Sequence, residues 1–217
     1  MLKLPTTRSF ATTLTAFAAA ALAAAVAAPA ALAAGPDLGK AAPDFAAADT
    51  YGKPVRLADF KGKLVVLEWS NHQCPYVRKH YGAGNMQKTQ GVARELGVVW
   101  ITIISSGPGE QGHVAAGEAN ALTAERNAKP HHVLLDPAGK IGRAYAARVT
   151  PHMFIVGTDG RLLYKGAIDS IRSSRQSDIE RAKNYVTAAL GEIKAGQPIA
   201  EADTIAYGCT IHYKEGS

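Results

Sequence analysis

Two cysteines, Cys74 and Cys209, are the residues of this chain best suited to covalent chemistry. A cysteine thiolate attacks disulfides and peroxides, and a pair of cysteines can cycle between dithiol and disulfide. Cys74 follows an apolar run at residues 64–67 and a short polar turn, and Pro75 comes directly after it. This order predicts that Cys74 stands where a buried strand gives way to a helix.

The start of the predicted helix is expected to activate the Cys74 thiol. Proline is favoured at the first helical position, because the missing N–H would have no intrahelical partner there. The unpaired amides of a helix N-terminus favour an anion, and Arg78 and Lys79 add positive charge close by. The alternative is a buried cysteine with a purely structural role. The local pattern favours a reactive thiolate.

Cys209 lies 135 residues after Cys74, and the two are the only cysteines of the chain. As a resolving cysteine, Cys209 would attack an oxidised Cys74 and close a disulfide. As a static partner it would pin the C-terminal tail, and closing so long a loop stabilises a fold by roughly 4–5 kcal/mol. The sequence leaves the reversible and the static bond equally open.

The first 33 residues have the composition of a secretory signal peptide. Lys3 and Arg8 form a basic head, residues 16–28 are apolar and rich in alanine, and residues 31–33 form a small-x-small cleavage site. The apolar part is shorter than the roughly 20 residues of a membrane span, so an anchor is the weaker interpretation and no stable membrane association is expected. The mature protein is therefore expected in the periplasm or outside the cell, where disulfides persist.

Removing the leader lowers the formal net charge from +6 to +4. A mild excess of this size, without a basic run interleaved with aromatic residues, argues against a nucleic-acid partner. We predict three parts: the signal peptide at residues 1–33, one folded domain at residues 34–195, and a tail at residues 196–217 that carries the second cysteine.

Strands and helices are expected to alternate along the folded part. We predict strands at residues 64–69, 98–104 and 133–135, and helices at residues 75–96 (broken near 82–84), 115–127 and 141–147. A hairpin of residues 152–156 and 161–166 turns at Asp159-Gly160, and an amphipathic helix follows at residues 178–195. This order predicts an α/β fold, a central mixed sheet flanked by helices on both faces.

The stretch around Cys74 resembles the thioredoxin superfamily, in which a strand bearing a tryptophan ends in Cys-x-x-Cys at a helix start. Here Trp69 ends the strand and the quartet is Cys74-Pro75-Tyr76-Val77, with Val77 in place of the second cysteine. The resemblance implies that Trp69, Pro75 and Tyr76 contact substrate.

A second point of resemblance is Thr150-Pro151, which precedes the strand predicted at residues 152–156. Proteins of this superfamily place a cis-proline beside the active cysteine. The resemblance therefore implies a cis Thr150–Pro151 bond, with the Thr150 backbone presented to a substrate chain as an added strand. The alternative is an ordinary trans-proline at the start of a strand.

Residues 42–63 resemble the N-terminal extension of redoxin domains, the AhpC/TSA group that includes peroxiredoxins. Residues 71–77 and 207–213 match a peroxiredoxin-like group with an NHCPYV-type motif and a C-terminal YGCSVKY-type ending, with Gln73 inserted. This likeness implies a thioredoxin-like oxidoreductase or antioxidant protein, with Cys74 as nucleophile and Cys209 as resolving cysteine. It implies protein thiols, disulfides or peroxide as substrates, an external thiol as reductant, and no organic cofactor.

The peroxide-binding pattern of peroxiredoxins is altered here. Asn71 and Leu67 stand where that pattern has a hydroxyl residue and a proline, which predicts a weak peroxidase at most. Arg148 is the nearest candidate for the peroxide-polarising arginine. His72 and Arg78 are expected to support Cys74, His72 through proton transfer and Arg78 through its charge.

Two other interpretations remain open at this stage. Cys74 with His72 and His80 could form a copper site on the same fold, because thiolate and imidazole suit copper; the domain could also be a non-catalytic, disulfide-stapled module. The spacing favours histidines outside any metal site. Glu68, within the apolar strand, is expected to be exposed at the strand end rather than to act as a buried proton acceptor.

Overall fold

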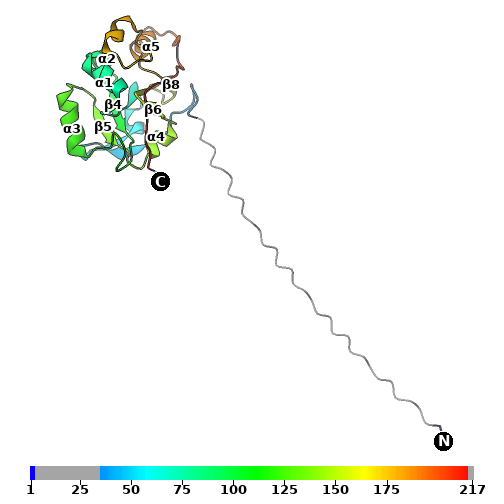
Figure 1. Cartoon of the computed structure of the whole chain (residues 1–217). Coiled ribbons are helices and arrows are strands. Elements are labelled where there is room, and N and C mark those ends of the chain that lie inside the picture. The colour runs from blue at the N-terminus through cyan, green and yellow to red at the C-terminus, as the bar shows by residue number, and fades with distance from the viewer. Residues whose placement is uncertain (3–34, 215–217) are drawn as a thin grey trace. The chain divides into compact units, whose positions relative to one another are not determined.

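The structure, a computed structural model, describes residues 1–2 and 35–214, so the predicted signal peptide lies almost entirely outside the described residues. Five strands form the central sheet, in the order β5, β4, β3, β7, β8. Their bounds are His132–Leu135, Val99–Ile104, Val65–Trp69, His152–Val156 and Leu162–Gly166. Figure 1 labels β4, β5 and β8 of this sheet. Strands β3, β4 and β5 run parallel, while β7 and β8 complete the sheet as an antiparallel hairpin. The predicted mixed sheet is confirmed.

Strand β3 lies at the centre of this sheet and is buried along its whole length. Its side chains alternate between two cores, because successive residues of a strand point to opposite faces. Val65, Leu67 and Trp69 enter the core on one face, and Val66 enters the core on the other. The apolar run at residues 64–67 thus positions Cys74, five residues beyond the strand.

Helices cover both faces, as predicted. One face carries α1 (Pro75–Gly82), α2 (Asn85–Glu95) and α5 (Tyr185–Lys194), which lie together at the top of Figure 1. Helix α3 (Ala116–Glu125) packs beside β5. The other face is covered by α4 (Lys140–Ala144) and the 3-10 helix η1 (Leu57–Phe60). No helix within the described residues is long and apolar enough to cross a membrane.

Two helix predictions had different outcomes. The expected break in the helix at residues 75–96 is confirmed, since α1 ends at Gly82 and α2 begins after Gly84, whose φ is 71°. The single helix predicted at residues 178–195 is wrong. A 3-10 helix, η2 (Gln176–Arg181), is followed by extended backbone at Ala182 before α5. Asn184 restarts the helix because its side chain accepts the Thr187 amide at 3.0 Å.

The N-terminal extension forms a hairpin of its own. Strands β1 (Ala46–Ala48) and β2 (Pro54–Arg56) pair antiparallel around Tyr51-Gly52. The Thr50 amide donates to the Val133 carbonyl at 2.9 Å, which ties this hairpin to the edge strand β5.

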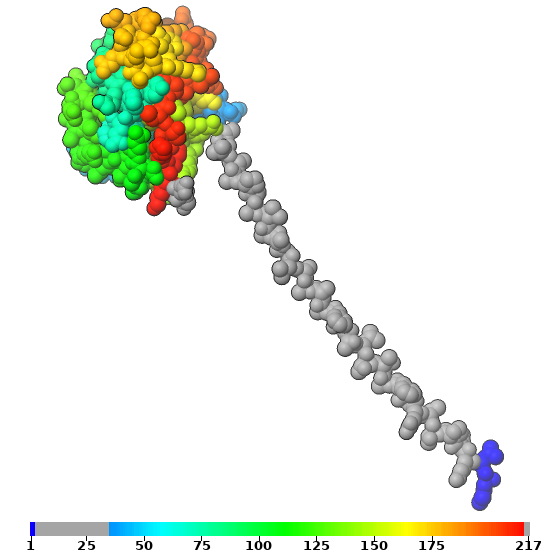
Figure 2. All heavy atoms as spheres, in the orientation of Figure 1, coloured from blue at the N-terminus to red at the C-terminus, as the bar shows by residue number. Residues whose placement is uncertain are grey.

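The C-terminal tail packs on the domain. Strand β9 (Cys209–Thr210) pairs antiparallel with β6 (Val149–Thr150), the short strand before β7. The Ile211 side chain is buried in the core below. Figure 2 shows this segment in red, lying on the surface of the fold.

Candidate active site

Cys74 is the N-cap residue of α1, and Pro75 occupies the first turn, as the sequence predicts. The polar turn before it is held by Asn71, whose side chain accepts the Gln73 amide at 2.8 Å and whose carbonyl accepts the Cys74 amide at 3.1 Å. The Cys74 carbonyl then accepts the first helical hydrogen bond, from Arg78 at 2.9 Å. Local sequence therefore fixes where this cysteine stands.

The Cys74 thiol meets the residue before the proline. Its Sγ donates to the Thr150 carbonyl at 3.1 Å, and the Thr150–Pro151 bond is cis, which confirms the predicted geometry of that bond. However, Cys74 has 0% of its surface exposed. This sulfur is therefore not directly reachable from solvent, because the C-terminal tail lies over it.

Cys209 is brought to the same point by the pairing of β9 with β6, which sets it directly opposite Thr150. It packs against the cluster that contains Cys74, and both residues are free thiols in this structure. Unlike Cys74, Cys209 is partly exposed. Burial, and next its contact with Cys74, raises the pKa of the Cys209 thiol to about 12.

The tail is fastened on both sides of Cys209. Before it, the Tyr207 hydroxyl donates to the buried carboxylate of Asp169. After it, the Ile211 amide donates to the Arg148 carbonyl at 2.9 Å, and the Tyr213 hydroxyl donates to the Ala147 carbonyl at 2.6 Å. The segment that carries Cys209 is therefore docked on the domain.

Gly208 allows this docking, and Gly208→Ala is expected to disturb it. The φ of Gly208 is 143°, and a Cβ there would overlap the Thr150 carbonyl oxygen. We expect the variant to lose more than about 1 kcal/mol of stability and to form the Cys74–Cys209 bond more slowly. Gly196→Ala is the matched control, because Gly196 has a φ of 68° with nothing within 4 Å of its Cβ position. Urea unfolding measures the stability, and timed oxidation by glutathione disulfide measures the rate of bond formation. Equal effects of Gly208→Ala and Gly196→Ala would contradict the prediction.

Tyr76 joins the two cysteine motifs. Its ring packs edge-on against the ring of Tyr207, with centroids 5.7 Å apart. Tyr76 was predicted to contact substrate; in this structure it contacts the tail, and Pro75 beside it is exposed. The stretch that begins at Cys74 and the stretch that ends at Cys209 are therefore in contact through these two tyrosine rings.

A buried charge cluster beneath the tail is absent from the sequence-based expectations. Lys79 Nζ donates to Asp169 Oδ2 at 2.7 Å and to the Ile171 carbonyl at 2.9 Å, and both charged side chains are almost completely buried. The Lys79 charge was expected to favour a Cys74 thiolate; it is instead paired with Asp169. The two residues are 90 positions apart, so no local pattern reveals the pair.

His80 belongs to this cluster and does not face Cys74. Its Nδ1 lies 2.8 Å from the Asn85 amide nitrogen, and its Nε2 lies 3.5 Å from the Tyr207 hydroxyl. Burial lowers the pKa of His80 to about 4. The ring is thus neutral at neutral pH, and it serves the packing of the tail.

Trp69 does not line the site, contrary to the prediction. Its side chain is completely buried, packs against Tyr145 and Phe154, and donates through Nε1 to Ser105 Oγ at 3.1 Å. The alternation of β3 places it in the core on the face opposite to the one in which Cys74 packs. It supports the sheet rather than a substrate.

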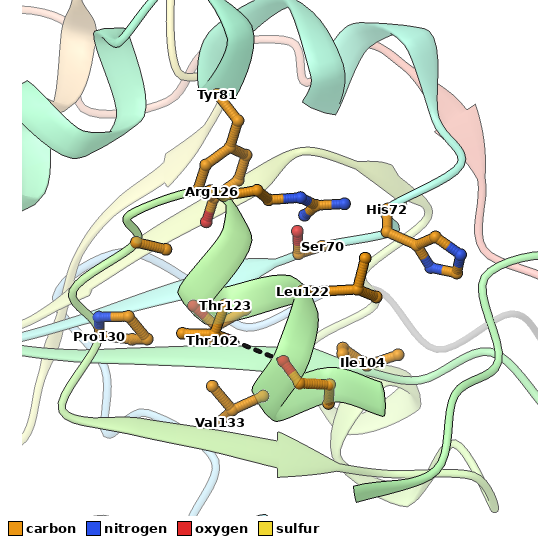
Figure 3. A pocket seen from close by; sticks show the side chains of 12 residues that line it. Ser70, His72, Tyr81, Thr102, Ile104, Leu122, Thr123, Arg126, Pro130 and Val133 are labelled. Carbon is orange, nitrogen blue, oxygen red and sulfur yellow. Dashed lines mark hydrogen bonds between the residues drawn. The ribbon is translucent and has the colours of Figure 1, made fainter. Parts of the chain in front are cut away.

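Three residues were predicted to assist the chemistry at Cys74: His72, Arg78 and Arg148. Each of them lies in other surroundings in the structure. His72 lies at the edge of a small pocket with Arg126 (Figure 3), and burial together with the Arg126 charge lowers its pKa. Arg78 is exposed on α1. The exposed Arg148 lines a cleft of about 350 Å³ with His152 and Lys165, and Cys74 is not among the residues of that cleft.

Glu68 is fully buried, so the expected exposure at the strand end is wrong. Its carboxylate accepts hydrogen bonds from the Trp100 Nε1 at 2.9 Å, Thr102 Oγ1 at 3.1 Å and the Tyr81 hydroxyl at 2.8 Å. Burial raises the pKa of Glu68, and these hydrogen bonds oppose the rise. Tyr81 and Thr102 also line the pocket in Figure 3, whose volume of about 30 Å³ has room for roughly one water.

Glu68 is expected to make stability depend on pH. Because its folded pKa lies above the ordinary value of 4.5, its contribution is fully present below that value and is lost as the pH rises through the folded pKa. Glu68→Gln cannot titrate and should remove a slope of up to about 1.4 kcal/mol per pH unit. Urea unfolding from pH 4 to 8 measures this, with the exposed Glu125→Gln as control. Parallel profiles for wild type and Glu68→Gln would rule the prediction out.

The described residues contain no set of side chains that could form the copper site considered above. Within residues 35–214, no three side chains of His, Cys, Asp or Glu gather where they could hold a metal ion. Cys74 bonds the Thr150 carbonyl, His72 lies at the edge of the pocket that Arg126 also lines, and His80 contacts the charge cluster.

The fold and this site define a thioredoxin-like protein: a cysteine at a helix N-terminus contacts the residue before a cis-proline at the edge of a mixed sheet. The model of the AhpC/TSA family matches residues 38–165. The chain therefore belongs to the AhpC/TSA family. The match includes Cys74 and Pro151 and ends before Cys209.

Solved structures share this fold. An uncharacterized conserved protein from Geobacillus kaustophilus has a TM-score of 0.70 at 24% identity, covering 83% of this chain and 94% of that chain. A hypothetical protein from Sinorhizobium meliloti 1021 has a TM-score of 0.69 at 22% identity, with coverage of 83% and 96%.

A third structure is that of a Chlorobium tepidum protein assigned as a thiol:disulfide interchange protein DsbE. It has a TM-score of 0.50 at 25% identity, with coverage of 60% of this chain and 84% of that chain. No curated protein matches the chain at a significant level.

Proposed function

We propose that this protein is a thiol–disulfide oxidoreductase in which Cys74 is the nucleophile and Cys209 resolves it. The observation that carries the proposal is the placement of the two thiols side by side: Cys74 donates to the Thr150 carbonyl, and Cys209 is paired with Thr150 and packs against the cluster that contains Cys74. Sulfurs so close exchange partners without a large rearrangement of the chain. Thr150 and Pro151 present the backbone beside which this exchange takes place.

The cycle balances with one external oxidant and one external reductant. Once the tail is displaced from it, the Cys74 thiolate attacks a disulfide sulfur and expels the first thiolate, leaving a mixed disulfide, or attacks a peroxide oxygen and expels an alcohol or water, leaving a sulfenic acid. Cys209 then attacks the Cys74 sulfur, forms the internal disulfide, and releases the thiol or water. Two equivalents of an external thiol return the pair to the dithiol and leave as a disulfide.

Disulfide exchange is favoured over peroxide reduction. Asn71 and Leu67 replace the hydroxyl residue and proline of the peroxiredoxin pattern. Arg148, the candidate for polarising a peroxide, lines a cleft that does not include Cys74. Antioxidant activity is therefore proposed only as a slow side reaction.

Export is part of the same proposal. The composition of residues 1–33 supports cleavage of a signal peptide and release into the periplasm or the medium. In such an oxidising compartment a dithiol pair requires a dedicated thiol reductant to complete its cycle.

Equilibration with a series of glutathione redox buffers tests the proposal. Acid quenching and mass spectrometry at each ratio give the fraction of the Cys74–Cys209 bond. We expect reversible formation with a midpoint above about −300 mV. A lower midpoint would mark a static structural disulfide and refute the proposal, as would the absence of any internal bond.

A further inference from the structure

The cleft of about 350 Å³ that Arg148 lines has the make-up of a small-molecule site. Such sites begin at a volume of about 300 Å³ and combine apolar walls with a few polar groups. Tyr145, Phe154 and Ile205 supply apolar surface here. Tyr145 and Phe154 belong to the core on the face of the sheet opposite to the one in which Cys74 packs, and neither cysteine lines the cleft.

The polar groups of this cleft are basic and incompletely paired. Within residues 35–214, the Arg148 guanidinium forms no hydrogen bond or ion pair. The Nδ1 atom of His152 is buried and has no hydrogen-bond partner. Lys165 Nζ lies 3.4 Å from Asp203 Oδ2 and so is the one cation of the three with an acidic partner. Because a buried polar atom without a partner is costly, the His152 nitrogen is suited to a ligand.

We propose that this cleft binds a small organic carboxylate with an apolar body, and that the bound anion holds the tail over Cys74. A guanidinium such as that of Arg148 pairs with a carboxylate through two parallel hydrogen bonds. Burial, and next the charges of Lys165 and Arg148, lower the pKa of His152 to about 4. The ring is therefore neutral at neutral pH and contributes a hydrogen bond rather than a charge, while the apolar walls cover the body of the ligand.

The tail forms one wall of the cleft, which couples the ligand to the cysteines. Residues 203–206 line the cleft from the tail side and lead directly to Cys209. Arg148 lies on the opposite wall, and its carbonyl accepts the Ile211 amide at 2.9 Å. A ligand between these walls contacts the tail only while the tail is docked, so it favours the docked form. This part rests on the proposed function, in which Cys74 reacts once the tail has moved away.

Isothermal titration calorimetry of the reduced protein tests the binding with three probes. Benzoate has a carboxylate on an apolar ring, benzamide is its neutral counterpart, and inorganic phosphate is an anion without an apolar body. We expect saturable binding of benzoate with a Kd below about 10 mM, and at least about tenfold weaker binding of the other two. No binding of benzoate, or equal affinity for benzamide or phosphate, would overturn the proposal.

Two variants and a control locate the bound anion. Arg148→Met keeps the side-chain stem and removes the guanidinium, and should weaken benzoate binding at least about tenfold. His152→Phe keeps a ring and removes the unpartnered nitrogen, and should weaken it at least about threefold. Arg56→Met is the matched control, because Arg56 pairs with Asp59 on the surface and is 65% exposed. Equal losses for Arg148→Met and Arg56→Met would place the anion elsewhere and refute the site.

Hydrogen exchange of the Ile211 amide measures the hold on the tail. At ten times its Kd, a ligand bound only to the docked form slows exchange about tenfold. We expect at least about threefold slowing with benzoate and none in Arg148→Met at the same concentration. The control is the Leu57 amide, which donates to the Phe45 carbonyl in the N-terminal extension and should not change.

An unchanged Ile211 exchange rate in saturating benzoate would refute the hold on the tail. The calorimetry and the exchange measurements use reduced protein and form no disulfide. Their failure would therefore leave the proposed redox function standing, whereas the absence of a Cys74–Cys209 bond would refute that function and leave the carboxylate site in place.

Discussion

Cys74→Ser is expected to abolish the redox cycle of this protein. The variant keeps the tail docked but lacks the sulfur that lies against Cys209 and Thr150. Without it no internal disulfide can form, and we expect glutathione-dependent reduction of a small disulfide to fall by at least about 100-fold. Turnover and the mass of the oxidised protein measure the effect.

Cys209→Ser is the informative counterpart. It should still form a mixed disulfide at Cys74 once a small oxidant reaches that sulfur, but it cannot close the internal bond. Circular dichroism and urea unfolding are the controls that test whether both variants fold. Full turnover by Cys74→Ser would show that Cys74 is structural, and full turnover by Cys209→Ser would remove the resolving role of the tail.

Lys79→Met is expected to have the largest effect on stability. The Lys79 ammonium and the Asp169 carboxylate are 2.7 Å apart, with side chains 0% and 1% exposed. Removing one partner of such a pair leaves an uncompensated buried charge, which costs about 3–5 kcal/mol. Because Asp169 also accepts from Tyr207, the tail should loosen at the same time. Urea unfolding measures the first effect, and hydrogen exchange of the Cys209 amide measures the second.

Two further variants sharpen this prediction. Asp169→Asn keeps a hydrogen-bond acceptor for Tyr207 but leaves Lys79 unpaired, so it should destabilise the fold to a similar degree. Lys183→Met is the matched control, because Lys183 pairs with Glu201 on the surface, where the side chains are 50% and 43% exposed. We expect that variant to lose far less. Equal losses for Lys79→Met and Lys183→Met would be inconsistent with a buried charge cluster.

The position of Cys74 could be predicted because every signal for it is local. An apolar run, a polar turn and Pro75 lie within a dozen residues, and each acts on the backbone of its own segment. The cis Thr150–Pro151 bond followed from family resemblance rather than from residue chemistry. The prediction of one long helix at residues 178–195 is wrong, and the reason for that is also local. Its apolar periodicity is real, but Asn184 caps a new helix and Lys183 donates to Ser170 at 3.0 Å.

The sequence by itself determined the α/β order of elements, the helix start at Cys74 and the pairing of two cysteines as the candidate chemistry. Only the tertiary structure decided which sulfur faces solvent, that Glu68 is buried and that Lys79 is neutralised by Asp169. Periodicity and capping act over a few residues, and so they can be read along the chain. Burial and charge pairing are set by segments 90 or more residues apart in this cluster, and they exist only once those segments have packed together.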